Sequence, residues 1–495
     1  MDRRDQGEAA AEDKTCPLAL LPDDVLADVL RRLPPRGLAV SRCVCKSWLA
    51  IVDAHRLLRA DLLPLSLGGF FINFHNYYLS EFFAPHSHRP CISGKHDYLP
   101  QARTDSWGYV DDHCNGLVLI HENDDNNDEI GYVLNPATRW VAPVPPCPPP
   151  PMEIKDTFQV EYLAYDPIES PYFEVVSITR FHWVNKPGDY LYDSSRDAVD
   201  PEIEQSEWPP SVCILQVFSS RTGQWEERYF AREGDSMGTV SGMRHCPGDQ
   251  RNAVYRRGAL YVHCQTNYVM RISLSSDKYH VIKPPPGVEG KNYPQFYLGK
   301  SSKGVYCASI EGRCRVQIWN LDESGCHMEW VLKHDRDLLK WLLKHKLQYT
   351  GPWALQDINY YYDNRNRDHG MEAPAEEKIE WTSQASEDEK FTWSSDDECG
   401  HTGYVDILGF HPCKDIIFLS ESITRGLAYH LNSSKVEVLG NIYPAGYDKE
   451  LGNEQLLESS FPYTPCWITQ TADDGEWLKR KSPVHVVTHA WDKRV

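Results

Sequence analysis

The feature that most constrains the fold is a dense apolar cassette near the start of the chain. The stretch "LPDDVLADVLRRLPPRGLAVSRCVCKSW" occupies residues 21–48 of 495. Apolar residues recur at helical spacing from Val25 to Leu33, directly after two aspartates, which favour a helix N-terminus. Pro34 and Pro35 then stop the helix. The pattern predicts one helix here and two further short helices, the last of them around Trp48.

The predicted helices are too short to make a self-sufficient core. Together they span about 40 residues, a size at which chains usually need disulfides, a metal or a partner to fold. Each leucine or valine left in water costs roughly 1.5 to 3 kcal/mol. We therefore expect the cassette either to pack on the rest of the chain or to dock on another protein.

Composition limits the partners and the compartment. The net charge of −20 and the pI near 5.4 argue against nucleic acid and against anionic membrane surfaces, and no apolar run is long enough to cross a bilayer. The polar residues 1–16 predict a disordered tail without a signal peptide. Fifteen cysteines without a C-x-x-C pair indicate reduced thiols in the cytoplasm or nucleus.

The search for catalytic and metal-binding motifs gives little. His86 and His88 form a His-x-His pair, but no third ligand lies nearby in the sequence. Phosphate-binding glycine loops and the common hydrolase motifs are missing from the sequence. We predict no catalytic residue, no metal and no cofactor. A glycosidase with paired carboxylates stays open, although it would not explain the front cassette.

The rest of the chain follows a different plan, in which short β-strand pairs recur. "CNGLVLI" is followed by "GYVLNPATRWVAPVP", and "RGALYVHC" by "YVMRISLSSDKYHVI"; similar pairs continue toward the C-terminus. Gly258 and Gly304 open two such pairs 46 residues apart, a spacing typical of a four-stranded propeller blade. We expect a β-propeller of about six blades over residues 66–490. A single large sandwich is the alternative.

Two segments interrupt the strand pattern. "RDLLKWLLKHKL" at 336–347 predicts an amphipathic helix packed on the β region. Residues 362–402 predict a disordered acidic insertion, because ten acidic residues stand against two lysines from 371 to 400. That insertion is either a solvated loop or part of a recognition surface.

The front cassette resembles the F-box at several separated points. The matching elements are the Leu-Pro opening, the leucine-rich first helix ending in "RLP", and "RCVCKSW" leading into the third helix. The resemblance covers about residues 17–60 and implies docking on a Skp-family adaptor, which hangs from a cullin scaffold in a ubiquitin ligase. The adaptor-binding candidates that it implies are Leu21, Pro22, Val25, Leu26, Leu30, Leu33, Pro34, Leu38, Val44 and Cys45. Trp48 is expected to pack inside the F-box.

"CNGLVLI…YVLNPATRW" resembles the F-box-associated region of plant F-box proteins, which is kelch-like. The chain is thus interpreted as α plus all-β, with a short three-helix F-box ahead of a propeller. Its expected function is that of a non-catalytic substrate receptor, in which propeller loops bind an unknown target protein. The alternative is a scaffold or inhibitor that uses the F-box outside a ligase.

Overall fold

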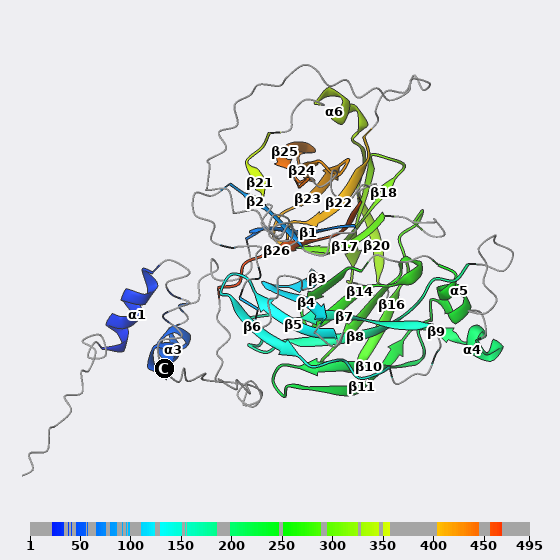
Figure 1. Cartoon of the computed structure of the whole chain (residues 1–495), viewed down its shortest axis with the longest axis horizontal. Coiled ribbons are helices and arrows are strands. Elements are labelled where there is room, and N and C mark those ends of the chain that lie inside the picture. The colour runs from blue at the N-terminus through cyan, green and yellow to red at the C-terminus, as the bar shows by residue number, and fades with distance from the viewer. Residues whose placement is uncertain are drawn as a thin grey trace, which may run out of the picture.

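The structure is a computed structural model of the chain. It describes residues 22–33, 46–55, 66–75, 80–86, 110–123, 129–150, 156–185, 199–246, 251–288, 295–324, 328–345, 350–356, 403–444 and 456–467, with a few single positions between them. In these ranges the chain has few helices and many strands (Figure 1). The mostly β-sheet character predicted for the body is confirmed.

Two short helices lie to one side of the β-sheet body (Figure 1). Helix α1 spans Asp23–Arg31 and helix α3 spans Lys46–Ala54. Pro22 precedes α1 with extended backbone, and the two aspartates of the first turn face the positive end of the helix dipole. The predicted start of the first helix is confirmed.

The two helices share a small apolar core, here called the helical cluster. Its buried members are Leu26, Ala27, Leu30, Leu38, Ile51, Val52 and Leu57. Leu33, Trp48 and Trp467 are partly buried against it. Each helix is nine residues long, below the length that is stable alone in water, so this shared core is what holds them.

The body consists of antiparallel sheets whose strands follow one another along the chain. Three four-stranded sheets are continuous, meaning that their four strands are consecutive in the chain. One contains β3 (Val110–Cys114), β4 (Leu117–Asn123), β5 (Glu129–Asn135) and β6 (Trp140–Val144). Another contains β17 (Gln295–Ser301), β18 (Gly304–Glu311), β19 (Arg315–Asp322) and β20 (Glu329–Asp337). A third contains β22 (Val405–Phe410), β23 (Ile416–Glu421), β24 (Arg425–His430) and β25 (Lys435–Asn441).

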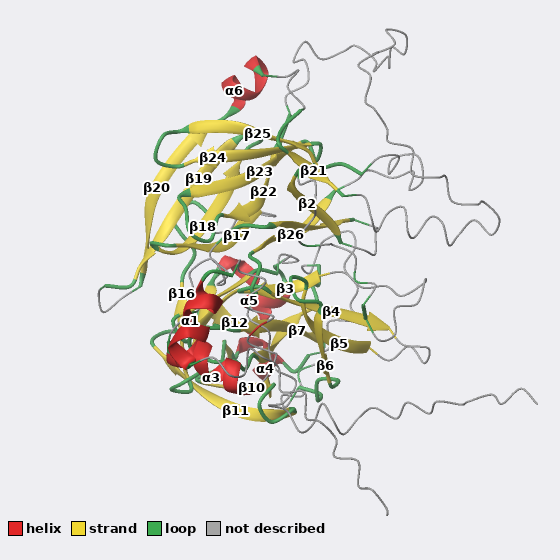
Figure 2. Ribbon diagram, turned by 90° about the vertical axis from the view of Figure 1, so that its left-hand side faces the viewer, coloured by secondary structure: helices red, strands yellow, loops and turns green. Residues whose placement is uncertain are grey.

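The largest sheet has eight strands and is built from two antiparallel halves. One half contains β7 (Thr157–Ala164), β8 (Glu174–Phe181), β10 (Val212–Ser219) and β11 (Gln224–Glu233); the other contains β13 (Ala253–Arg256), β14 (Ala259–His263), β15 (Val269–Ser273) and β16 (Lys278–Ile282). The last strand of each half, β11 or β16, lies at the centre of the sheet, where the two pair in parallel and join the halves. A small ribbon of β9 (Glu207–Trp208) and β12 (Gly238–Thr239), with helices α4 (Pro201–Gln205) and α5 (Val240–Arg244), lies beside it (Figure 2).

One further sheet joins segments from both ends of the sequence. Its strand order is β21 (Trp353–Leu355), β2 (Glu81–Pro85), β1 (Gly69–Phe74) and β26 (Leu457–Tyr463). The β1–β26 pair connects residues almost four hundred positions apart in the chain.

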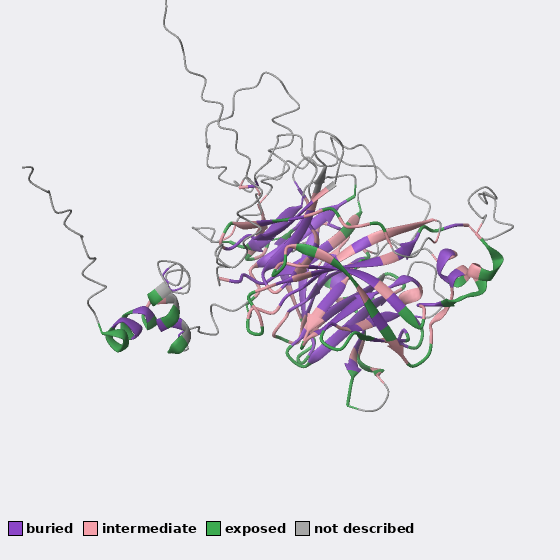
Figure 3. Cartoon of the chain, turned by 90° about the horizontal axis from the view of Figure 1, so that it is seen from below, coloured by how far each residue is buried: buried purple, intermediate pink, exposed green. Residues whose placement is uncertain are grey.

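The first strands of successive units contact one another in a closed ring. β3 contacts β7, β7 contacts β13, β13 contacts β17, β17 contacts β22, β22 contacts β26, and β26 returns to β3. Apolar side chains fill the space between neighbouring sheets. The strands are accordingly buried along much of their length, as the purple segments show (Figure 3). Sheets stacked about a common axis in this way form a β-propeller-like architecture.

One of the smaller predictions can be compared with the structure, and the predictions of disorder cannot. The amphipathic stretch forms only a six-residue helix, α6 (Leu339–Lys344), whose Leu342 is buried against the β-sheets beside Leu338. The acidic insertion at 362–402 and the N-terminal tail lie outside the described residues. No helix in the described ranges is long and apolar enough to span a bilayer.

Candidate functional site

The outer face of helix α1 carries apolar side chains that are exposed. Val25 is 43% exposed and Val29 is 44% exposed, four residues apart on the same side of the helix. Pro22, at the N-cap, is also exposed. A helix this small leaves valines in water only at a cost, so this face fits a partner protein.

The other predicted adaptor-binding residues differ in burial from Pro22 and Val25, which are exposed. Leu26, Leu30 and Leu38 point into the helical cluster and are buried there. Leu33 and Trp48 are half-buried at its edge. Leu21, Pro34, Val44 and Cys45 lie outside the described residues.

Trp467 connects the helical cluster to the β body. This tryptophan comes four residues after the end of β26 and packs against the cluster. Among the described residues, Trp467 is the side chain of the β body that packs on the helical cluster, and it follows a strand of the ring. Sequence reasoning did not single out this residue.

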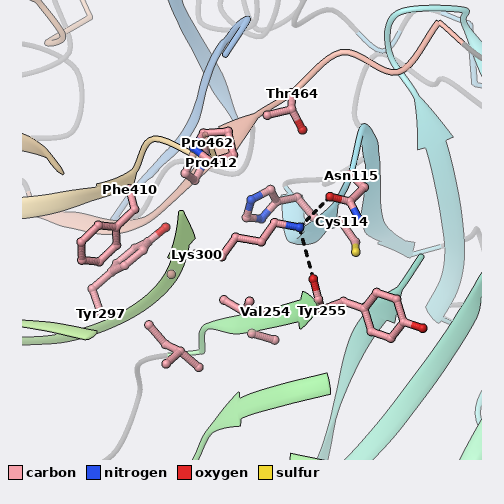
Figure 4. Close-up of a pocket in the computed structure, with 14 residues that line it drawn as sticks. Cys114, Asn115, Val254, Tyr255, Tyr297, Lys300, Phe410, Pro412, Pro462 and Thr464 are labelled. Carbon is pink, nitrogen blue, oxygen red and sulfur yellow. Dashed lines mark hydrogen bonds between the residues drawn. The ribbon is translucent and has the colours of Figure 1, made fainter. Parts of the chain in front are cut away.

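A second candidate site is a small cavity where the first strands of the ring end (Figure 4). Its volume is about 40 Å³, and its walls come from β3, β13, β17, β22 and β26 or from the turns that follow them. Here it is called the axial cavity. Its lining includes His113, Asn115, Lys300, Pro412 and Thr464.

Lys300 provides the charge of the axial cavity. Its Nζ donates to Asn115 Oδ1 at 2.6 Å and to the backbone oxygen of Tyr255 at 3.2 Å (Figure 4). Both acceptors are neutral, and no carboxylate pairs with this ammonium in the described part of the chain. An ammonium has three N–H donors, so one remains available to a ligand.

The turn between β3 and β4 brings Asn115 into place. Asn115 Nδ2 donates to the backbone oxygen of Tyr165 at 2.6 Å, which fixes the amide so that Oδ1 faces Lys300. Gly116 follows with φ of +91°, and a Cβ there would come within 2.3 Å of the Cys466 Cβ. The "CNG" of the sequence therefore needs its glycine for two reasons, the left-handed backbone and the close approach of Cys466.

Three groups near the axial cavity are neutral at physiological pH. Burial lowers the pKa of His113 to about 3, with Lys300 adding to the effect. Burial also raises the pKa of the Asp112 carboxyl to about 8, against the hydrogen bond it accepts from the Leu163 N–H at 2.7 Å. Burial likewise raises the pKa of the Cys114 thiol to about 12. These groups do not neutralise Lys300.

The strand motifs singled out from the sequence serve to join neighbouring sheets. Trp225 donates its Nε1–H to the backbone oxygen of Pro145 in the preceding unit at 2.8 Å. Trp140 packs in the same interface, and Tyr279 is fully buried between the two halves of the eight-stranded sheet. Among the described residues no group of three His, Cys, Asp or Glu side chains could hold a metal ion. His88 lies outside the described residues, so the His-x-His pair has no structural account.

No sequence motif marks Lys300, His113 or Thr464 as site residues. Each lies on, or just after, a first strand of the ring, and these strands carry polar residues such as those of "VDDHC" in β3. Strands are recognised in a sequence by the alternation of polar and apolar residues, and a strand with several polar residues in a row resembles a loop by that criterion.

Comparisons with known proteins agree with the arrangement of the front helices. Residues 18–60 match the F-box domain family, so the chain contains an F-box domain. A protein of Arabidopsis thaliana described as an F-box protein is 25% identical over 330 residues, which are 64% of this chain and 67% of that protein. Another from the same plant, described as an F-box/kelch-repeat protein, is 30% identical over 134 residues, 26% of each chain. Among solved structures, "YCF48 bound to D1 peptide" reaches a TM-score of 0.30 at 6% identity, covering 76% of this chain and 82% of that one.

Proposed function

We propose that this protein is the target-binding subunit of a cullin–RING ubiquitin ligase. Its F-box docks on a Skp-family adaptor and, through it, on the cullin, while the β body holds the protein to be modified. The observation that carries the proposal is the F-box match at residues 18–60. The chain itself makes no covalent intermediate; it contributes proximity between the target's lysines and a loaded conjugating enzyme.

We assign the adaptor contact to the accessible residues of α1 and its flanks. Pro22, Val25 and Leu33 of the predicted set are at least partly exposed, and Val29 extends the same face. The buried members Leu26, Leu30 and Leu38 stabilise the helices that present this face. Leu21, Pro34, Val44 and Cys45 remain candidates from the F-box resemblance.

The domain division follows the same proposal. We propose a tail at residues 1–16, the F-box at residues 17–60, and a propeller of about six blades at residues 66–490 that carries the acidic insertion 362–402. Six blades are supported by the three continuous four-stranded sheets, the two halves of the eight-stranded sheet, and the sheet that joins β1 with β26. Such a receptor acts in the cytoplasm or the nucleus, where its thiols stay reduced.

The test is co-purification of the full chain with a Skp-family adaptor. Val25→Asp with Val29→Asp should abolish co-purification, because two charges would be buried in an apolar contact. Ile168→Asp is the control, since Ile168 is an exposed apolar residue on the β body. Adaptor binding that survives the α1 double variant would refute the assigned face.

The same experiment separates the ligase from the rival function. A receptor in an active ligase should bring down cullin with the adaptor, and its targets should accumulate when the proteasome is inhibited. A scaffold or inhibitor outside a ligase should bind partners whose abundance does not respond to proteasome inhibition.

A further inference from the structure

The axial cavity is too small for a whole ligand but large enough for the tip of one. Its volume of about 40 Å³ compares with roughly 300–1,000 Å³ for ordinary small-molecule sites and about 30 Å³ for one water in the liquid. A group of two or three heavy atoms fits. Such a group reaches the cavity when a larger molecule, lying over this end of the ring, carries it.

Two hydrogen-bond donors that face this space have no acceptor for at least one O–H or N–H among the described residues. Lys300 keeps one N–H free after its bonds to Asn115 and Tyr255. Thr464 is only 4% exposed, lines the cavity, and makes no side-chain hydrogen bond in the described part of the chain. Its hydroxyl is turned toward Lys300 (Figure 4). This hydroxyl can therefore donate to an acceptor that enters the cavity from outside.

The charge of the cavity selects an anion. Lys300 has no carboxylate partner in the described ranges, whereas the neighbouring Lys303 is paired with Asp415. Beyond the ring of Tyr255 lies a separate pocket of about 240 Å³ with Asp166 and Glu169 in its wall, which repels anions. An anionic group arriving at this end of the ring is therefore favoured only on the Lys300 side.

We propose that the axial cavity binds a single carboxylate carried by the target protein, either an Asp or Glu side chain or a free chain terminus. The carboxylate accepts from Lys300 Nζ and from the Thr464 hydroxyl, which together satisfy both free donors. Asn115 holds Lys300 in place and makes no contact with the target. The inference rests on the proposed function in taking the bound molecule to be a target protein.

The test uses the full chain co-expressed with its adaptor and four sets of nine-residue peptides with otherwise random sequence. The sets carry a fixed internal Glu with an amidated end, a fixed Gln with an amidated end, a fixed Gln with a free C-terminal carboxylate, or a fixed phosphoserine with an amidated end. The Glu set, the free-carboxylate set or both should be retained about tenfold better than the Gln-amide set, as one charge-assisted hydrogen bond allows. The pattern tells the two carboxylate sources apart.

Variants connect the preference to the cavity. Lys300→Met should remove the carboxylate preference and Thr464→Val should weaken it severalfold, while Lys303→Met, at an exposed paired lysine, should leave it intact. Lys300→Arg keeps the positive charge and should keep the carboxylate preference. It replaces Lys300→Met as the test of this position if the methionine variant unfolds at too low a temperature. Equal retention of all sets, retention of phosphoserine alone, or a preference that survives both Lys300→Met and Thr464→Val would overturn the proposal. Adaptor co-purification is scored on the same samples, so loss of adaptor binding with an intact preference counts against the ligase assignment alone.

Discussion

Asn135 donates its side-chain N–H to the backbone oxygen of Cys466 at 3.0 Å, across 331 residues of sequence. Two residues further on, the Ala137 N–H donates to the Tyr463 hydroxyl at 3.1 Å. The turn after β5 is thereby fastened to the segment that follows β26, at the point where the ring of first strands closes. "NPAT" is a closure element as well as a turn.

Asn135→Ala should destabilise the whole β body. The substitution removes the donor to a buried carbonyl, which should cost about 1 to 3 kcal/mol. Denaturant unfolding followed by tryptophan fluorescence measures the loss. Asn432→Ala, at an exposed asparagine bonded to Asp415, is the control and should change stability little. Equal effects of the two variants would mean that the Asn135 contact contributes nothing to closure.

Gly116 and Gly258 form a matched pair for measuring how much a steric clash with the closure segment lowers the free energy of unfolding. Both have positive φ, +91° and +73°, but only Gly116 has atoms where a Cβ would stand. Gly258→Ala should cost about 1 kcal/mol for backbone strain alone. Gly116→Ala should cost about 1 to 3 kcal/mol more, because Cys466 has to move. Thermal unfolding of the two variants compares them, and a difference near zero would show that the closure segment yields easily.

Asp112→Asn should change the pH dependence of stability. The folded pKa of about 8 lies above the ordinary 3.8, so the folded state retains a proton that the unfolded state has lost. The wild type is thus expected to lose stability from this group as pH rises from about 4 to about 8, at up to about 1.4 kcal/mol per pH unit.

Asparagine keeps the acceptor for the Leu163 N–H and does not ionise in this range. Chemical denaturation at pH 5, 6, 7 and 8 should therefore show the variant gaining on the wild type with each step. Parallel curves would contradict the raised pKa.

Trp467→Ala should uncouple the F-box from the β body. Trp467 is the described residue of the β body that packs against the helical cluster, so its truncation should free the helices to melt and move separately. Limited proteolysis in residues 56–66 should accelerate severalfold, and calorimetry should show a separate low-temperature transition. Trp183→Ala, at an exposed tryptophan, should do neither. If the variant still binds the adaptor but supports slower ubiquitin transfer, the lost function is the orientation of the β body relative to the F-box.

Deleting residues 362–400 should leave adaptor binding and thermal stability nearly unchanged, since loop length adds little to the entropy cost of closure. We expect basic targets to be lost first, because the segment is strongly acidic. Pull-down mass spectrometry of the two forms at low and physiological salt makes the comparison. Identical target sets at both salt concentrations would assign the segment a purely solvating role.

Sequence patterns predicted the second and third strands of the units better than the first ones. "GLVLI", "GALYVH" and "GLAYH" are apolar and preceded by turn residues, and each is a strand in the structure. First strands such as "VDDHC" and "AVYR" are only five and four residues long and show no polar–apolar alternation, so the sequence pattern does not mark them as strands. The sheet that joins β1 to β26 could not be predicted locally, because its strands come from distant parts of the chain.

The front helices show the converse limit. Helical spacing correctly placed α1, yet spacing alone does not say which leucines turn inward. Leu26 and Leu30 are buried while Val25 and Val29 are exposed, a division that depends on where α3 packs. The axial cavity lay beyond sequence reasoning because its lining comes from five strands that meet only in the ring.

The pairing of β1 with β26 has a consequence for synthesis on the ribosome. β1 emerges about 390 residues before its partner, which at roughly 5–20 residues per second is a wait of roughly 20 to 80 seconds. Throughout that time "GFFINF" is an unpaired, phenylalanine-rich edge, the kind of strand that recruits other nascent chains. The F-box helices are already made by then. Newly made molecules should therefore depend on chaperones for the β body even where the adaptor has already bound.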